Sequence, residues 1–470
     1  MEEPVTALLF GAGDRGAGAY GRFALEAPDQ LRFVAVAEPN EERRNRFACD
    51  HQIPPENCFT GWEEALAAGR VADVVINCTH DSLHHASGMA ALQAGYDMLL
   101  EKPIAPTLAE AVALVQTAEQ LGRKLMICHV LRYAEFFEAL GEVLQSGALG
   151  QLITVSWREN VAAYHMAHSY VRGNWRNTQQ AAPMILAKCC HDLDLLVWYL
   201  RDPVIWLASS GSLLHFRPEN APAGAPDRCT DGCPAQMTCP FYAPAIYRDM
   251  LPIKYTLARS SQIPVRALGR AIIKNPRLVA VIESLPAGRP LQAALTAWPR
   301  SVATPHPEDD EAVMQALREG PFGRCVYHCD NNVVDHQIVL MTTQSGVSVS
   351  LTMHGHSYEE RRTIRFDGSK ATLLGKFAHA SVYLELWDQR GFLLWRRTFA
   401  SEVDRKQSGH GGGDAGLMRA FVRMIHGQAD PLNSARSALQ SHLLAFAAEK
   451  ARLEERTIRM ESFLQEEGLG

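Results

Sequence analysis

The chain has 470 residues, of which 47% are hydrophobic and 21% are charged, and its formal net charge is −6. This composition is ordinary for a globular protein, and the length is sufficient for two or more domains with large cores. The acidic balance leaves no electrostatic footprint for nucleic acid, and no apolar run reaches the length that spans a membrane.

The first residues and the cysteines indicate a cytoplasmic protein. Residues 1–4 are acidic and lack the basic and apolar regions of a secretion signal. The eleven cysteines are an odd number spread through both halves of the chain, which suits a reducing compartment better than a disulfide framework. We expect no membrane segment and no nucleic-acid partner.

A glycine-rich turn follows the first apolar strand. Gly11, Gly13 and Gly16 stand at the G-x-G-x-x-G spacing of dinucleotide-binding turns, and Asp14 and Arg15 lie between the last two glycines. In such turns the first glycine permits a tight bend, the second lets a pyrophosphate approach the backbone, and the third lets the next helix pack closely. The phosphates then lie on free N–H groups at a helix N-terminus. These five residues are predicted to bind a dinucleotide, with a purely structural turn as the alternative.

The second predicted strand ends in Glu38, whose carboxylate can accept hydrogen bonds from a ribose diol. Glu38 therefore favours NAD over NADP. Arg43 and Arg44 leave an NADP alternative open, because a nearby arginine can accept a 2′-phosphate. The other interpretation of these two arginines is a solvated helix face.

Apolar strands and helical patterns alternate through residue 130. The predicted strands are Thr6–Phe10, Phe33–Ala37, Val71–Cys78, Asp97–Leu100 and Lys124–Val130, and the predicted helices are Glu41–Asp50, Trp62–Gly69, Ser87–Gly95 and Leu108–Leu121. Strict alternation predicts an α/β fold with a doubly wound parallel sheet and helices on both faces. We assign residues 1–130 to this NAD-binding domain.

Polar residues follow two of these strands at the edge where nucleotides bind in doubly wound sheets. Thr79 and His84 follow the third strand, and the turn Glu101-Lys102-Pro103 follows the fourth. We expect these side chains to lie at the cofactor. Lys102 can donate a hydrogen bond to a substrate hydroxyl or take part in its deprotonation. An ordinary surface lysine is the alternative.

These motifs, together with the later segment from His191 to Leu196 (H-D-L-D-L-L), resemble in order and spacing the glucose-fructose oxidoreductase and inositol dehydrogenase (Gfo/Idh/MocA) family. The resemblance implies a Rossmann domain followed by a larger α/β domain, residues 131–470, with an open, mostly antiparallel sheet for substrate binding and oligomerisation. It also implies a homo-oligomer and a carbohydrate or cyclitol substrate. By this resemblance Lys102 and His191 are the catalytic residues.

One position departs from the family pattern. Many members carry an aspartate four residues before the catalytic histidine, and Ala187 stands there in this chain. Lys188 follows it and is expected either to contact a substrate oxygen or anionic group, or to pair with Asp192 or Asp194. Seen without the family, His191 would be a helix cap or a core residue, although its imidazole has an ordinary pKa suited to accepting a proton.

Two further segments are candidates for binding substrate. Residues 165–177 are rich in hydrogen-bond donors and aromatic rings, as sugar sites are, and we select Arg172, Trp175 and Arg176 there. The alternative is a loop packed on its own domain or on an oligomer partner. His410 stands in a glycine run that can pass close to a ligand, or that is simply a flexible turn.

The segment 203–323 is rich in proline and glycine and is expected to be an irregular insertion. Cys229, Cys233 and Cys239 suggest a structural zinc site, with Cys329 as the fourth ligand and Cys325 or His328 as alternatives. Free thiols are an equal alternative, and an iron–sulfur cluster is less favoured.

Strand patterns return after this segment and helical patterns end the chain. The predicted strands are His336–Thr343, Gly346–Met353, Arg361–Phe366, Ala371–Leu374, Ser381–Trp387 and Leu393–Phe399, and the predicted helices are Ala415–His426 and Ala435–Glu455.

Two enzymatic functions fit these residues. The first is a dehydrogenase that transfers hydride from a sugar, glycoside or cyclitol hydroxyl to NAD, while His191 and Lys102 handle the proton. The second is an NAD-dependent glycosidase that oxidises C3 transiently, eliminates the aglycone, adds water and is then re-reduced, so that NAD is recycled. The glycosidase needs a further base, for which Lys188, His165, His168 and His410 are candidates. A nucleotide sensor without catalysis is a weaker third hypothesis.

Overall fold

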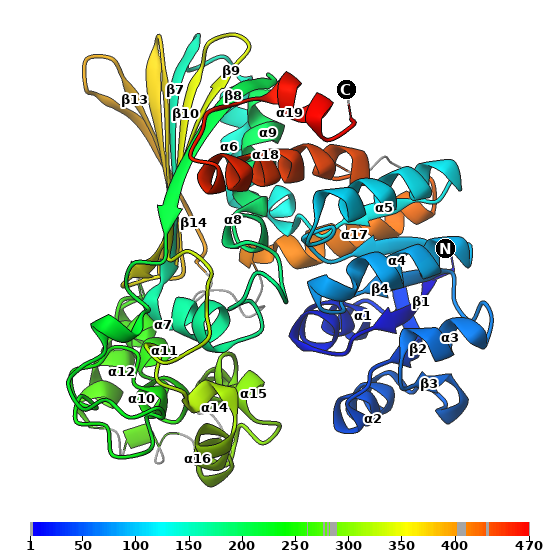
Figure 1. Ribbon diagram of the computed structural model, residues 1–470, viewed down its shortest axis with the longest axis vertical. Helices are drawn as coiled ribbons and strands as arrows, with labels where there is room; N and C mark the ends of the chain where they lie inside the picture. Colours follow the sequence, from blue (N-terminus) through cyan, green and yellow to red (C-terminus); the bar gives the residue numbers. More distant parts are fainter. Residues whose placement is uncertain are drawn as a thin grey trace.

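The computed structural model describes residues 3–260, 262–275, 278–279, 282, 289–401, 410–428 and 432–469. Within these residues the chain forms two sheets, and helices fill the space between them (Figure 1). Insertion helices lie below the second sheet in this view. No helix of the described ranges is long and apolar enough to cross a bilayer.

The first described sheet is parallel and has the strand order β3-β2-β1-β4-β5-β6. Its strands are buried on both faces and therefore read as continuous apolar runs in the sequence. The order reverses between β1 and β4, which is where dinucleotides bind in such sheets. The strands are β1 (Val5–Phe10), β2 (Leu31–Ala37), β3 (Cys58–Phe59), β4 (Val74–Asn77), β5 (Asp97–Leu100) and β6 (Leu125–Ile127).

The helices of this half begin where side chains cap them. Asn40 accepts a hydrogen bond from Arg43 N at the start of α2, and Thr107 accepts one from Glu110 N at the start of α5. The helices are α1 (Arg22–Glu26), α2 (Glu41–His51), α3 (Trp62–Ala67), α4 (His84–Gln93) and α5 (Leu108–Gln120).

The second described sheet has the order β14-β13-β12-β11-β7-β10-β9-β8-β15 and is antiparallel except for the parallel pair β7 and β10. The prediction of an open, mostly antiparallel sheet is confirmed. Buried and more exposed residues alternate along strands such as β10, so one face packs on helices. The strands are β7 (Leu152–Ala162), β8 (Val204–Ser212), β9 (His336–Thr343), β10 (Ser348–Ser357), β11 (Arg361–Gly368), β12 (Ala371–Ala378), β13 (Ser381–Asp388), β14 (Leu393–Phe399) and β15 (Ile458–Arg459).

The C-terminal helices join the two halves. Helix α18 contacts α9 and β8 on one side and α5 on the other, and it lies between the two halves in Figure 1. The backbone of Asn433 accepts a hydrogen bond from Ile127 N in β6, and Lys124 Nζ donates to Met424 O at 2.7 Å. The helices around this junction are α6 (Glu135–Gln145), α7 (Ala163–His165), α8 (Met184–Ala187), α9 (Cys190–Leu200), α17 (Gly413–Ile425), α18 (Ala435–Leu453) and α19 (Met460–Glu466).

The described residues of the segment 203–323 contain a strand and short helices, so this segment is more regular than its composition predicts. Its first residues form β8, and short helices with small apolar clusters of their own follow. Pro244, Pro252 and Pro264 suggest breaks in the sequence, but each stands in the first turn of a helix, where a missing N–H costs nothing. The helices are α10 (Ala243–Tyr247), α11 (Leu251–Leu257), α12 (Ile263–Lys274), α14 (Arg289–Thr296), α15 (Arg300–Ala303) and α16 (Asp310–Glu319).

Candidate active site

The glycine turn has the shape that a dinucleotide requires. Gly11 has φ +84°, and a Cβ there would lie 2.6 Å from Cys78 O; a Cβ on Gly16 would lie 2.1 Å from Gly11 O. These two glycines are needed for packing. No described atom lies within 4 Å of the place where a Cβ on Gly13 would stand. The turn is therefore open beside Gly13, where a diphosphate can approach the backbone.

Glu38 lies beside this turn and is 5% exposed. Its carboxylate accepts hydrogen bonds from Ala12 N at 2.8 Å and from Asn40 N at 2.9 Å. An ionised carboxylate has about four acceptor positions, so two remain for a ribose diol. The guanidinium of Arg44 donates to the Glu38 carbonyl oxygen at 2.6 Å. The cradle fits NAD.

Arg15 and Glu101 belong to a buried ionic cluster behind the turn. Arg15 donates to the carboxylates of Glu101 at 2.8 Å and Asp414 at 2.6 Å, and to the Tyr20 hydroxyl at 2.8 Å. Although burial opposes ionisation, Arg15 holds the pKa of Asp414 well below its ordinary value. The cluster ties the glycine turn, the end of β5 and α17 together. Asp14, also predicted at the cofactor, is exposed in the first helical turn after Gly13.

Thr79 and His84 hold the loops that follow β4 and β5. The Thr79 hydroxyl donates to Asn77 Oδ1 at 2.8 Å. His84 is 1% exposed, with Nδ1 2.7 Å from Pro103 O and Nε2 3.1 Å from Thr79 O. His84 thus links the two loops and positions Lys102, which precedes Pro103.

The structure brings Lys102 and His191 together from different parts of the chain. Lys102 Nζ donates to the carbonyl oxygen of Ala187 at 2.9 Å, at the end of α8, and His191 lies in the first turn of α9. Burial, and next the positive charge of Lys102, holds the pKa of His191 well below its ordinary value. A neutral imidazole beside a cationic lysine can accept a proton from a hydroxyl. The Ala187 carbonyl anchors Lys102 at the position where many family members carry the aspartate.

His410 also reaches this place. Its backbone has φ +46°, and Gly411 and Gly412 follow with φ +68° and +91°. Its Nδ1 lies 3.3 Å from Asp414 Oδ2, and its ring centroid is 6.0 Å from that of His191. The left-handed turn therefore presents His410 toward the candidate active site.

Lys188 pairs with other carboxylates than those predicted. Its Nζ lies 2.6 Å from Glu360 and 3.3 Å from Glu159. Burial opposes its charge, but both carboxylates raise the pKa of Lys188 above its ordinary value. Pairing with Asp192 or Asp194 is therefore wrong, because other residues hold these two carboxylates: Arg362 binds Asp192 at 2.7 Å, and Arg132 binds Asp194 at 2.7 Å.

The two other candidate bases are engaged nearby. His165 Nδ1 lies 3.1 Å from Glu360 Oε2, on the same carboxylate that holds Lys188. His168 Nδ1 lies 3.0 Å from the Tyr247 hydroxyl, and burial lowers the pKa of His168 to about 3.

Of the three residues selected in 165–177, Trp175 alone is placed beside the Rossmann sheet edge. Its ring is 5.8 Å from that of His80, just beyond β4. Arg172 is fully buried and donates to the carbonyl oxygens of Arg324 and Phe241, each at 2.7 Å. Arg176 binds Asp330 at 2.9 Å. Arg172 thus ties its segment to the insertion at Phe241, and Arg176 ties it to Asp330 just after the insertion.

The eleven cysteines are all free thiols. In the part of the chain that the structure describes, no group of three or more His, Cys, Asp or Glu side chains is arranged to hold a metal ion. Cys229 Sγ lies 3.5 Å from the Arg172 guanidinium, and Cys329 Sγ donates to Cys325 O at 3.2 Å.

Four residues at the site were not singled out in the sequence, and only two of them carry a signal that could have identified them. His129 follows β6 as Lys102 follows β5, so its place at a strand end is a signal that could have been used. Asp414 stands four residues after His410, and the left-handed turn between them brings the two together. Glu159 and Glu360 lie on segments with no local pattern that predicts their pairing with Lys188.

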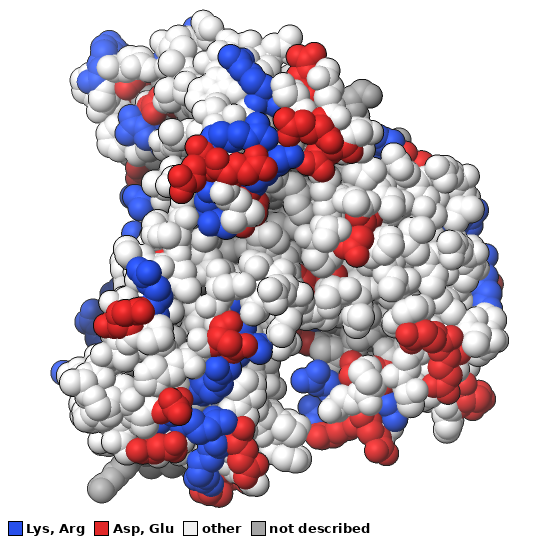
Figure 2. All heavy atoms as spheres, viewed as in Figure 1, with Lys and Arg blue, Asp and Glu red and all other residues white. Residues whose placement is uncertain are grey.

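Figure 2 shows acidic and basic side chains interspersed on the face in view, and a hollow between the lower part of the Rossmann half and the insertion helices. A Rossmann sheet in this strand order, an open glycine turn with a buried glutamate, and a lysine and histidine beside them define an NAD-binding protein. Residues 5–129 match the GFO_IDH_MocA family, described as an oxidoreductase family with an NAD-binding Rossmann fold. The match assigns this N-terminal part of the chain, residues 5–129, to the Gfo/Idh/MocA family.

Known relatives agree with this assignment. The chain is 27% identical to an inositol 2-dehydrogenase of Leifsonia xyli over 36% of this chain and 46% of the relative. It is 30% identical to a 1,5-anhydro-D-fructose reductase of Ensifer adhaerens over 36% of this chain and 49% of the relative. The chain thus matches about half the length of these curated relatives.

A solved structure extends the similarity of fold to nearly the whole chain. An oxidoreductase from Agrobacterium radiobacter, crystallised with NAD+, L-tartaric acid and magnesium, has a TM-score of 0.62 at 14% sequence identity. The alignment covers 98% of this chain and 99% of that chain.

Proposed function

We propose that the protein is an NAD-dependent dehydrogenase that oxidises a secondary hydroxyl of a sugar, glycoside or cyclitol. The observation that carries this proposal is the convergence of Lys102 and His191 at the carboxyl edge of the Rossmann sheet. Relatives named as an inositol dehydrogenase and an anhydrofructose reductase support the substrate class.

Bound NAD would supply the acceptor for the hydride that leaves the carbon bearing the hydroxyl. Gly11, Gly13, Gly16 and Glu38 hold the cofactor. Lys102 donates a hydrogen bond to the substrate oxygen, which stabilises negative charge as the O–H bond breaks. His191 accepts the hydroxyl proton, because burial and the lysine charge keep its imidazole neutral.

The engaged side chains favour a dehydrogenase over the NAD-recycling glycosidase. The glycosidase needs a second base for C–H abstraction; all four candidates have polar partners, but the ring of His410 lies near that of His191. Lys188 and His165 share Glu360, and His168 contacts Tyr247. Only His410, half-exposed beside Asp414, is left for that role, so a dehydrogenase is the simpler function.

The test is a steady-state assay of the purified protein with NAD. The panel contains myo-inositol, free aldoses, 1,5-anhydro sugars and nitrophenyl glycosides, and both NADH absorbance and nitrophenol release are followed. A dehydrogenase accumulates NADH with turnover. Release of nitrophenol without net NADH would establish the glycosidase instead, and neither signal on any substrate would refute an enzyme acting on this class.

A matched pair of lysine variants checks the role of Lys102. Lys102→Met should lower kcat at least about 100-fold. Lys124→Met is the control, since Lys124 Nζ also donates to backbone carbonyls, those of Met424 and Ile425, but far from the site. Light scattering of the same samples tests the expected homo-oligomer.

A further inference from the structure

His129 is a buried imidazole beside the candidate base and has no role in the reaction described so far. It follows β6, is 1% exposed, and its ring centroid is 5.5 Å from that of His191. Neither of its ring nitrogens has a hydrogen-bond partner within the described ranges. Burying an unpaired polar group costs about 1–3 kcal/mol, so such a group calls for an explanation.

The unpaired nitrogens of the two histidines complement each other. His191 Nδ1 is also buried and unpaired among the described residues. If Nε2 of His191 accepts the substrate proton, Nδ1 carries the ring N–H and needs an acceptor. A neutral His129 offers one acceptor nitrogen, and the ring separation is compatible with an N–H···N hydrogen bond after a small rotation.

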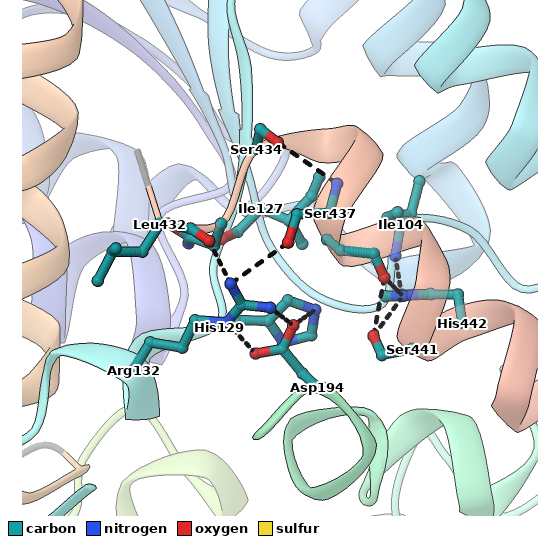
Figure 3. Close-up of polar contacts among 12 residues, drawn as sticks. Ile104, Ile127, His129, Arg132, Asp194, Leu432, Ser434, Ser437, Ser441 and His442 are labelled. Carbon is teal, nitrogen blue, oxygen red and sulfur yellow. Dashed lines mark hydrogen bonds and ion pairs between the residues drawn. The ribbon is translucent and has the colours of Figure 1, made fainter. Parts of the chain in front are cut away.

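The carboxylate of Asp194 favours hydrogen on Nε2 of His129, although the two groups are not hydrogen-bonded in the structure. His129 Nε2 lies 3.7 Å from Asp194 Oδ1, so an Nε2–H points to the carboxylate and Nδ1 is left as the acceptor (Figure 3). Arg132 binds both oxygens of Asp194 at 2.7 Å and keeps the carboxylate in place. All three unpaired nitrogens are then accounted for.

We propose that His129 and Asp194 are positioning residues that complete a His191–His129–Asp194 relay, in place of the aspartate that position 187 lacks. As His191 takes the substrate proton at Nε2, a small rotation of the two rings lets its Nδ1–H donate to His129 Nδ1 and brings His129 Nε2–H from 3.7 Å into hydrogen-bond range of Asp194. No bond other than the substrate O–H is broken by these residues. The hydrogen bonds of the relay stabilise the charged imidazolium more than the neutral imidazole. Because this charge develops in the transition state, the difference lowers the activation barrier.

The neighbouring charges leave His129 neutral. Burial, and then the charges of Arg132 and Lys102, hold the pKa of His129 well below its ordinary value, although Glu101 acts in the opposite direction. The other titratable or charged groups around the two rings are Asp192 and Asp194 on α9, Cys190 before them, Arg362 on β11, His410 before α17 and His442 on α18. A neutral His129 has a ring nitrogen that can accept a hydrogen bond, whereas both ring nitrogens of a charged His129 would be donors.

His442 provides a matched control. It is another buried histidine, and its ring centroid is 5.7 Å from that of His129. Its Nε2 accepts from Ile104 N at 3.0 Å and its Nδ1 donates to Ala438 O at 2.9 Å, so both nitrogens are already satisfied by backbone (Figure 3). His442→Gln should therefore cost stability without affecting His191.

The test measures His191 with and without its partner, in the full chain. The pH dependence of carbethoxylation by diethylpyrocarbonate reports the pKa of His191, since only the neutral imidazole reacts. The tryptic peptide 189–201 contains His191 as its single histidine. The same variants, His129→Leu, His129→Gln and His442→Gln, are assayed for kcat against pH.

His129→Leu should lower the pKa of His191, because the imidazolium loses its acceptor, and should lower kcat about 10- to 100-fold. His129→Gln keeps an acceptor and should recover part of both effects, and it remains informative if the leucine variant does not fold. If His129 acted only as a neighbouring like charge, its removal would raise the pKa of His191. That rise, or an unchanged value, would overturn the relay.

The inference rests on the proposed alcohol oxidation, but the two can fail separately. If the wild-type protein forms no NADH on any substrate of the panel, the proposed function fails. The carbethoxylation profiles still decide whether His129 supports His191.

Discussion

The buried Arg132–Asp194 ion pair should cost far more stability when it is broken than an exposed pair elsewhere in the chain. Arg132 and Asp194 side chains are 2% and 1% exposed, and two hydrogen bonds of 2.7 Å join them. Arg132→Met leaves Asp194 as an uncompensated buried charge, which costs about 3–5 kcal/mol. The variant also loses contacts of Arg132 with Leu432 O and Ser437.

Arg436→Met is the matched control. Arg436 on α18 pairs with Glu119 on α5, but these side chains are 62% and 45% exposed. An exposed pair of this kind is worth at most about 1 kcal/mol. Adding Asp194→Asn to Arg132→Met removes the orphaned charge and should restore part of the stability.

Urea unfolding followed by tryptophan fluorescence measures the difference. We expect the decrease in the urea midpoint to be several times larger for Arg132→Met than for Arg436→Met. Equal midpoints would refute the reasoning that burial makes this pair costly to break. A double variant less stable than Arg132→Met alone would show that lost packing, and not the orphaned charge, dominates.

Four other substitutions test the cofactor turn, the ribose site and the buried carboxylate of Glu159. Gly13→Ala should leave Tm unchanged but weaken NADH binding, because its Cβ would occupy the open space that the phosphates need. Gly16→Ala should lower Tm, because its Cβ would clash with the backbone. Calorimetry measures Tm and NADH fluorescence measures binding, and an equal loss of Tm in the two variants would contradict the distinction. Glu38→Gln should weaken NADH binding about tenfold by losing charge-assisted hydrogen bonds, and an unchanged Kd would remove Glu38 from the ribose site. Burial raises the pKa of Glu159 to about 7, so its contribution to stability is present below the ordinary glutamate pKa and is lost as pH rises through 7. Glu159→Gln should therefore gain Tm relative to wild type between about pH 5 and about pH 8, and a constant difference would count against this shift.

The Rossmann half could be predicted because its signals are local. Strands buried on both faces read as apolar runs, and the glycine spacing has one mechanical purpose. In the second half, β9 and β14 match their predicted bounds, since alternating patterns mark a half-buried sheet.

The rest depends on contacts between distant segments. The strand β7 was not predicted because it carries the polar run Arg158-Glu159-Asn160, and Glu159 is buried only because Lys188 and Arg362 reach it. Arg172 was predicted at the substrate because a donor-rich segment does not reveal which acceptors its side chains meet. Lys102 and His191 were placed by family resemblance, and their surroundings, from Ala187 O to His129, emerged only from the fold.

The junction made by α18 and the residues before it has a consequence for how the molecule is made. The open edge of β6 pairs with Asn433, and α5 packs on a helix that ends at Leu453. Nearly the entire polypeptide must therefore leave the ribosome before β6 and α5 of the nucleotide-binding half can be covered. We expect a nascent chain halted near residue 130 to be a substrate for chaperones, and not an autonomous folding unit.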